Sequence, residues 1–328
     1  MSAAPTLAPR QGLAYGLLGL PLAFVMLPLY VVLPNHYANA FAMPLATLGA
    51  VLLGARLLDA AIDPLLGRWS DRLFARSLRA VWAVAAVSAL VLAAGLVALF
   101  YPPPTGPQGL AVWALVCLLI SYIAFSQLSI SHQAWGARLG GDELHRGRIV
   151  AWREACGLAG VVLASVLPGL FGLPTMLAVF AVALALGWLT WTRAPRPAAR
   201  HALSVSSTSL WHPWRCAQFR RLLAVFMLSG IASSVPATLV LFFVQDRLRA
   251  TPMQEPLFLA TYFVCAALSI PLWLRLVARW GLARTWLAGM LLSVAVFANV
   301  AALGAGDIAA FVAVCSLSGV ARGADLAL

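Results

Sequence analysis

The sequence predicts an all-α polytopic membrane protein, and two observations lead to this fold class. Its 328 residues are 62% hydrophobic and only 10% charged, a composition far more apolar than that of soluble globular proteins. Apolar runs also recur along the whole chain, each near the ~20 residues that a helix needs to cross a bilayer. Glycine and proline occur throughout these runs, which favours helices over a β-barrel with its short alternating strands.

Ten membrane spans are expected, separated by short polar breaks. We interpret the first as a helix and not a signal peptide, because its apolar run is too long and no small-residue cleavage site is evident. The expected spans are 12–36, 44–66, 80–101, 110–134, 149–171, 174–192, 222–245, 255–275, 284–303 and 307–328.

The basic residues predict a cytoplasmic N-terminus. All 22 are arginine, and with the N-terminus inside, 17 of them fall in cytoplasmic segments while only Arg247 and Arg249 fall on the other side. Short cytoplasmic loops are enriched in positive residues in just this way. The net charge of +12 therefore indicates a membrane orientation, with the lipid bilayer as partner, and not nucleic-acid binding.

One long polar break divides the chain. Residues 193–221 are rich in Pro, Ser and Arg, which is typical of a linker, here cytoplasmic and basic with aromatic residues that suit a membrane surface. The predicted domains are a six-helix bundle at 1–192, this linker, and an incomplete bundle of four helices at 222–328.

The two halves share a weak internal repeat. The stretch D-P-L-L-G-R-W-S-D-R at 63–72 aligns with I-P-L-W-L-R-L-V-A-R at 270–279. Parallel repeats build the two halves of some transporters, with the binding site between them. The same alignment places Phe263, Ala266 and Ile270 at Arg56, Asp59 and Asp63, so the second half lacks these three charges and any ion chemistry is expected in the first half.

Three charges inside the second span form the main candidate site. Arg56, Asp59 and Asp63 are spaced i, i+3 and i+7, so they share one helix face. Each costs about 2.5–3.5 kcal/mol near the bilayer centre, and such residues normally pair, face a polar cavity or work. Arg56 is expected to pair with Asp59, which leaves Asp63 more free. A purely structural ion pair remains open, yet it does not need the second carboxylate, so a cation or proton site is favoured.

The fourth span is unusually polar. Within S-Y-I-A-F-S-Q-L-S-I-S-H-Q-A-W at 121–135, the side chains of Ser126, Gln127, Ser131 and His132 either line a solute cavity or hydrogen-bond between packed helices. For His132 two further interpretations stay open: it carries a proton, or it is simply hydrated near the cytoplasmic end.

Other charged and small residues have simpler interpretations. Arg153 and Glu154, at the start of the fifth span, either take part in function or reach for the interface. Arg322 and Asp325 are expected to pair at i, i+3. Five glycines are expected to allow close helix contact: Gly12, Gly16, Gly19, Gly157 and Gly160.

An enzyme, a cofactor and a structural metal are not expected. Asp59 and Asp63 lie one turn apart on one helix, whereas intramembrane aspartyl proteolysis needs acids from two helices. The sequence contains no G-x-x-x-x-G-K loop and no nucleophile turn. The five cysteines show no paired spacing and are expected to be small core residues.

The pattern R-x-x-D-x-x-x-D-P-x-x-G-x-x-x-D-R at 56–72 resembles the glycoside–pentoside–hexuronide:cation symporters, the melibiose-permease group of the major facilitator superfamily. Further similarity lies in 15–24, 146–160 and 230–244, and G-A-D-L-A-L at the end is similar to the family's tenth span. The resemblance implies a pseudo-symmetric bundle of twelve helices, of which about ten are present, and so a C-terminally truncated chain. It also implies a bacterial plasma (inner) membrane location.

The resemblance assigns roles to particular positions. Asp59 and Asp63 match the carboxylates that bind the coupling cation, and Arg56 matches an arginine beside them. Trp135 and Arg153 match an aromatic and a basic position near the family's sugar pathway. A cytoplasmic gating loop of the superfamily is matched by Gly67, Asp71 and Arg72.

Departures from the family pattern bear on the ion and the solute. Ile62 and Leu128 stand where sodium-using members have Asn and Thr, and Ala23 and Ser131 stand where sugar-binding acids are found. Sodium prefers several oxygen ligands, whereas a proton needs one carboxylate. A proton is therefore preferred over Na⁺ as the coupling ion, although Na⁺ at Asp59 and Asp63 stays open, and a galactoside solute is in doubt.

The expected function is cation-coupled symport of a sugar or glycoside-like small polar solute by alternating access. Two alternatives stay open. The chain is either a non-transporting truncated remnant of such a symporter, or a transporter of an amphipathic, lipid-like solute on the same scaffold.

Overall fold

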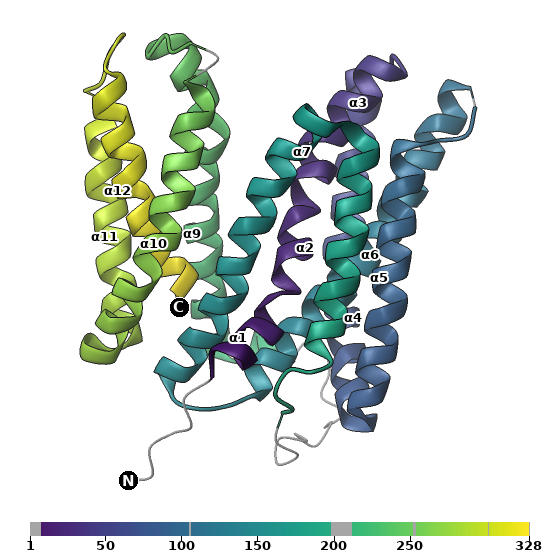
Figure 1. Cartoon of the computed structure of the whole chain (residues 1–328), viewed down its shortest axis with the longest axis horizontal. Coiled ribbons are helices and arrows are strands. Elements are labelled where there is room, and N and C mark those ends of the chain that lie inside the picture. Colours follow the sequence, from purple (N-terminus) through teal and green to yellow (C-terminus); the bar gives the residue numbers. More distant parts are fainter. Residues whose placement is uncertain (1–7, 105, 198–211, 252–253, 301, 328) are drawn as a thin grey trace. The chain divides into compact units, whose positions relative to one another are not determined.

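The structure is a computed structural model that describes residues 8–104, 106–197, 212–251, 254–300 and 302–327. Contacts divide the chain into two units, Met1–Val205 and Ser206–Leu328, which are treated separately below. In their described parts both units consist of helices joined by short connections (Figure 1). Most of the predicted linker, at 198–211, lies outside the described residues.

The first unit begins with an interrupted helix. Prolines at 21, 28 and 34 remove backbone donors and disturb regular α-geometry, and the segment accordingly contains a π-helical turn at Pro28–Val32. Its elements are α1 (Pro9–Gly16), α2 (Gly19–Phe24), η1 (Pro28–Val32) and α3 (Leu33–Ala40).

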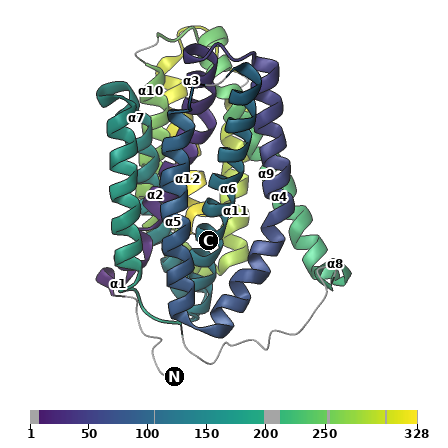
Figure 2. The ribbon, with the colours of Figure 1, turned by 90° about the vertical axis from the view of Figure 1, so that its right-hand side faces the viewer.

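Four longer helices complete the first unit. They are α4 (Leu45–Arg76), α5 (Leu78–Phe100), α6 (Pro107–Arg138) and α7 (Glu143–Trp191). α7 covers the fifth and sixth predicted spans and is interrupted at Gly172, where φ is +79°. A positive φ suits glycine, and the interruption falls where the sequence separates the two spans. α6 lies between α4 and α5 and contacts both, as Figure 2 shows.

The second unit contains α8 (His212–Arg215), α9 (Ala217–Phe242), η3 (Phe243–Arg247), α10 (Glu255–Trp280), α11 (Leu282–Val300) and α12 (Ile308–Ala327). Its main packing is α10 on α12 and α11 on α12. A small aromatic cluster forms where Phe311 of α12 contacts Phe258 of α10 and Phe243 of η3.

Nine helices within the described residues are long and apolar enough to cross a membrane, and α9 covers the seventh predicted span. The chain is an integral membrane protein, as predicted. Two helices are longer than expected, because α4 continues to Arg76 and α6 to Arg138. Hydropathy marks only the lipid-facing part of a helix, and polar turns beyond it keep their backbone hydrogen bonds in water.

Close contact between the first segment and α7 confirms the role expected for the glycines. A Cβ atom on Gly16 would lie 2.6 Å from the carbonyl oxygen of Trp152, and one on Gly160 would overlap the carbonyl oxygen of Leu20. Backbones that approach this closely tolerate no side chain between them. Glycine therefore fixes how the first segment packs on α7.

Candidate functional site

α4 and α6 lie side by side in the same direction. Ser126 of α6 donates a hydrogen bond from Oγ to Asp59 Oδ1 of α4 at 3.1 Å. Twelve residues later, Arg138 Nη2 of α6 contacts Asp71 Oδ1 of α4 at 2.7 Å. In each pair the two partners are 67 residues apart in the sequence. The two helices therefore keep the same register along roughly 18 Å.

Asp59 has partners on both carboxylate oxygens. Arg56 Nη1 lies 3.0 Å from Asp59 Oδ2, which confirms the predicted ion pair, and Ser126 occupies Oδ1. The Asp59 side chain is buried, so these contacts replace water for a charge inside the membrane region.

Asp63, one turn further along α4, is arranged differently. It is half-buried, and its Oδ1 atom is buried without a hydrogen-bond partner among the described residues. Pro64 follows and has no backbone N–H, so the carbonyl of Ala60 lacks its usual helical donor. Asp63 therefore keeps one buried carboxylate oxygen without a described partner, one turn from a carboxylate whose two oxygens both have partners.

Two tyrosines contact Arg56 in a way that the sequence did not predict. The guanidinium carbon lies 4.3 Å from the centre of the Tyr30 ring and 4.6 Å from the centre of the Tyr122 ring. Tyr30 belongs to η1 and Tyr122 to α6, so three elements meet at this arginine. Both distances are within the range of cation–π attraction.

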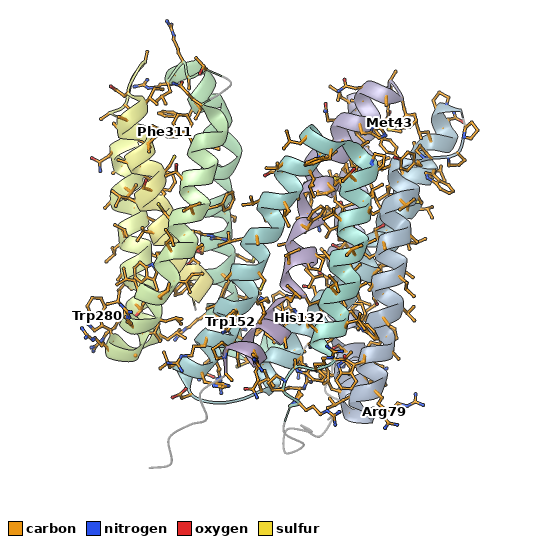
Figure 3. All side chains as sticks on the ribbon, viewed as in Figure 1. Met43, Arg79, His132, Trp152, Trp280 and Phe311 are labelled. Atoms are coloured by element: carbon orange, nitrogen blue, oxygen red, sulfur yellow. The ribbon has the colours of Figure 1, made fainter. Side chains whose placement is uncertain are left out.

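His132 is buried within the first unit, which contradicts one of its open interpretations, that the side chain is simply hydrated. Its side chain has 0% exposure, because its ring stacks on Tyr15 at 4.4 Å and meets Trp191 edge-on. His132 Nε2 lies 2.9 Å from the carbonyl oxygen of Tyr15, and the Tyr15 hydroxyl donates to the carbonyl of His132. Figure 3 shows His132 nearer the Arg79 end of this unit than the Met43 end.

The other residues expected to contact solute on the fourth span are also buried by helices of their own unit. Gln127 donates to Ser131 at 3.0 Å, and Trp135 donates from Nε1 to the carbonyl of Pro195 at 2.9 Å. Gln127, Ser131 and Trp135 are each at most 1% exposed. The Gln127–Ser131 bond lies within α6, whereas Ser126 and His132 hydrogen-bond to other helices, so the second interpretation of this polar run describes Ser126 and His132. A solute-binding role for Gln127, Ser131 and Trp135 stays a prediction.

Arg153 lies half-buried on α7. Its guanidinium contacts the Glu154 carboxylate at 2.6 Å, and its backbone packs closely on Gly19. The arginine is thus already neutralised by its sequence neighbour. Solute binding and interfacial anchoring by Arg153 both stay predictions.

The predicted gating residues are helical and not in a loop, which corrects that expectation. Gly67, Asp71 and Arg72 lie inside α4, which ends only at Arg76. Asp71 and Arg72 are exposed, and Asp71 is paired with Arg138, whose guanidinium also lies 4.0 Å from the Phe74 ring centre. The contacts described for Asp71 are therefore within the first unit.

The second unit holds a smaller polar cluster. Arg322 Nη1 lies 3.0 Å from Asp325 Oδ2, which confirms the predicted pair. Trp286 of α11 also donates from Nε1 to Asp325 Oδ1 at 2.9 Å. The cluster links α11 to α12.

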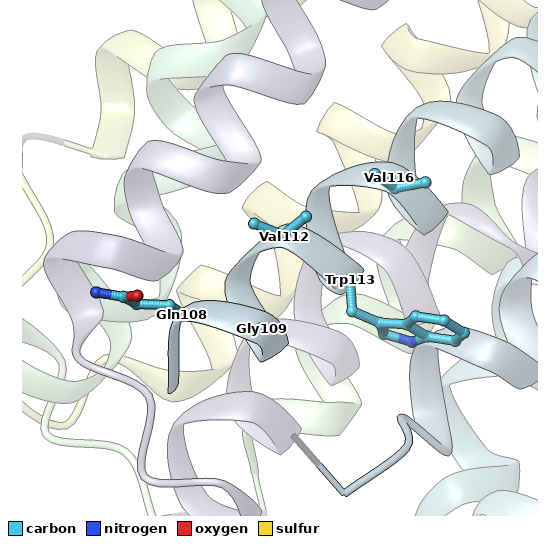
Figure 4. Close-up of a pocket in the computed structure, with 5 residues that line it drawn as sticks. All are labelled: Gln108, Gly109, Val112, Trp113 and Val116. Atoms are coloured by element: carbon cyan, nitrogen blue, oxygen red, sulfur yellow. The ribbon is translucent and has the colours of Figure 1, made fainter. Parts of the chain in front are cut away.

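A shallow apolar hollow lies away from all these residues. It has a volume of about 390 Å³ and is lined by Gln108, Gly109, Val112, Trp113 and Val116 near the start of α6 (Figure 4). Val112 and Val116 are exposed on an apolar face, which suits contact with lipid. Within the described ranges, no three His, Cys, Asp or Glu side chains gather as metal ligands.

Comparison with known proteins agrees with this architecture. A solved structure of the major facilitator superfamily proton:xylose symporter XylE, bound to 6-bromo-6-deoxy-D-glucose, superposes with a TM-score of 0.56 over 97% of this chain and 79% of that chain, at 14% identity. This likeness confirms the predicted major-facilitator fold.

Two curated relatives from Escherichia coli K12 share part of the sequence. The putative glycoside/cation symporter YagG is 25% identical over 158 residues, 47% of this chain and 33% of the relative. The inner membrane symporter YicJ is 26% identical over 132 residues, 40% of this chain and 28% of the relative. The matched parts thus cover about a third of these relatives or less.

A family model described as MFS/sugar transport protein matches residues 12–327, almost the whole chain. The family consists of transport proteins, not enzymes, in agreement with the sequence motifs. The chain belongs to the MFS/sugar transport protein family.

Proposed function

We propose that this protein transports a sugar or glycoside-like solute together with a cation, by alternating access of its two helical halves. The main observation in support is that two carboxylates one turn apart on α4 have different surroundings. Asp59 is held by Arg56 and Ser126, while Asp63 keeps a buried oxygen without a described partner. A carboxylate with a vacant oxygen inside a membrane region is suited to take up and release a small ion.

The proposed coupling ion is the proton, with Na⁺ as the second candidate. Leu128 is fully buried on α6 and Ile62 precedes Asp63, and neither offers a side-chain oxygen. A proton needs one carboxylate, whereas Na⁺ requires several oxygen ligands. The few oxygens beside Asp63 therefore favour the proton.

The coupling step follows from charge. When Asp63 takes up a cation, the net charge of the Arg56–Asp59–Asp63 stripe changes by one, and this change biases the helix packing around α4 and hence solute affinity. Linkage requires the converse, so bound solute raises affinity for the ion by the same factor. The proposed site of action is the bacterial inner membrane, with the N-terminus in the cytoplasm. The arginine distribution and the name of the relative YicJ support this location.

Uptake by the purified protein in liposomes tests the proposal. The probes are labelled D-xylose, D-glucose and methyl β-D-xyloside, with labelled lysophosphatidylcholine as the amphipathic alternative. An inward proton gradient should drive accumulation of at least one sugar, and an uncoupler should abolish it. Accumulation of the lipid alone, or of no probe under either a proton or a sodium gradient, would contradict the proposed function.

A further inference from the structure

We propose that Tyr30 and Tyr122 are positioning residues that hold Arg56 on Asp59, so that Asp63 alone takes the coupling ion. The inference rests on the proposed function for its meaning, but its geometry is independent of any solute. It assigns two tyrosines to the ion site and gives the two carboxylates different roles, with Asp59 paired to Arg56 and Asp63 binding the ion.

The first step is the contact of the guanidinium with two aromatic rings. The guanidinium carbon of Arg56 lies over both, at 4.3 Å from the centre of the Tyr30 ring and 4.6 Å from that of Tyr122. An arginine side chain has many rotamers, and fixing one is entropically costly. Attraction to two ring faces compensates for this cost and directs the guanidinium toward its neighbours. The rings thus confine the charge to a narrow set of positions.

The second step is what those positions allow. Arg56 is one turn from Asp59 and its Nη1 atom contacts Asp59 Oδ2 at 3.0 Å. Asp63 is two turns away on α4. An arginine confined by the rings neutralises the nearer carboxylate and leaves the farther one without this counter-charge. The difference between the two aspartates therefore comes from the rings as well as from their spacing.

The third step concerns where the rings come from. Tyr122 is 2% exposed and one turn before Ser126 on α6, so one helix face supplies both the ring on Arg56 and the hydroxyl on Asp59. Tyr30 is 38% exposed and lies in the π-helical turn η1. Such turns are often found at functional sites. A shift of the first segment against α4 would move one ring and loosen Arg56.

Carbodiimide labelling tests, without a solute, whether Asp59 and Asp63 have these different roles. Dicyclohexylcarbodiimide modifies carboxyl groups in apolar surroundings, and mass spectrometry identifies the aspartate modified. In the native protein we expect labelling at Asp63 and about tenfold less at Asp59, whose two oxygens are both engaged. In Tyr30→Leu/Tyr122→Leu, Asp59 should be labelled about fivefold to tenfold more, because the arginine is released.

Matched variants identify the ring as the cause. Tyr30→Phe/Tyr122→Phe keeps both rings and should label like the native protein, as should Tyr101→Leu, which removes an exposed tyrosine elsewhere. Arg56→Gln should expose Asp59 by itself, and adding the Leu substitutions to it should change nothing further. Tyr30→Leu alone is the variant to use if the double substitution prevents folding, because Tyr30 is partly exposed.

Two results would overturn the inference. If Asp59 stays unlabelled in the Leu variants while Arg56→Gln exposes it, the rings do not hold the arginine. If the Phe variants behave like the Leu variants, the hydroxyls and not the rings are responsible. Failure of the proposed function looks different, since it is an absence of cation-dependent uptake in the native protein, whatever the labelling pattern.

Discussion

Ser126 donates a hydrogen bond to Asp59 across 67 residues of sequence, and Arg138 contacts Asp71 across the same separation. The equal separations mean that α4 and α6 are parallel and keep one register from the buried carboxylate to the exposed end. The polar contacts of the candidate ion site and the ion pair at the helix ends are therefore parts of one helix interface. Sliding one helix along the other would disturb both contacts together.

Replacing Asp63 should uncouple transport. Asp63→Asn keeps the shape of the side chain but has no negative charge and cannot take up a proton, so we expect proton-driven accumulation to fall to the background level. Exchange of labelled for unlabelled solute across the same liposomes should persist. Asp307→Asn is the control, since the Asp307 side chain accepts a hydrogen bond from the Gly304 amide and an Asn oxygen can do the same. Accumulation by Asp63→Asn at the native level would contradict the assignment.

Removing the Ser126 hydroxyl should weaken the site from the side of α6. Ser126→Ala leaves Asp59 Oδ1 buried without its donor, which typically costs about 1–3 kcal/mol of unfolding free energy. Ser126→Thr retains a hydroxyl and should lose much less. Thermal unfolding in detergent measures the difference, and equal midpoints for Ala and Thr would mean that the hydrogen bond contributes nothing.

Charge balance between Arg56 and Asp59 gives a third prediction. Asp59→Asn or Arg56→Gln alone leaves one charge uncompensated, whereas the double variant removes both. Since Arg56 is about one-third exposed, water screens part of the interaction, and we expect a coupling energy of about 1–2 kcal/mol. A double-mutant cycle on unfolding free energy measures it. Strictly additive effects would show that the 3.0 Å contact is energetically silent.

The parts of this site that the sequence predicted are local. Arg56 and Asp59 are three residues apart on one helix, so their contact follows from helix geometry alone, and the same holds for Arg322 and Asp325. The apolar runs predicted the spans for a related reason, because the hydrocarbon thickness sets their length. Even the interruption of α7 at Gly172 falls at the expected break.

The parts that it did not predict depend on contacts between elements. Ser126 stood out as polar, but pairing it with Asp59 requires the register of α4 against α6. Tyr30 reaches Arg56 from a π-helical turn that no periodic pattern marks. One interpretation of His132 placed its side chain in water because of its depth along the span, yet the rings of Tyr15 and Trp191, from distant segments, pack against it. Depth along one helix does not determine burial by its neighbours.

Glycine at the contact between the first segment and α7 gives a prediction about stability. In Gly160→Ala the new methyl group would overlap the carbonyl of Leu20, so the helices must separate, at a cost of about 1–3 kcal/mol. Gly54→Ala on α4 is the matched control, because a Cβ there meets nothing within 4 Å. It should be neutral or stabilising by up to about 1 kcal/mol, since alanine favours helix. Similar unfolding midpoints for the two variants would contradict the close approach.

Variants of the Asp71–Arg138 ion pair test whether this contact affects gating without affecting stability. Asp71 is 60% exposed in its side chain, and pairs of this kind contribute at most about 1 kcal/mol. Asp71→Asn should therefore leave the unfolding midpoint nearly unchanged. If this end of α4 takes part in gating, the variant should still lower the initial rate of uptake, and Arg138→Gln should lower it to a similar extent because it breaks the same contact. Asp142→Asn is the control, because Asn can still cap the start of α7 as Asp142 does through the His145 amide. Normal uptake rates in both Asp71→Asn and Arg138→Gln would show that the pair is structural only and that gating lies elsewhere.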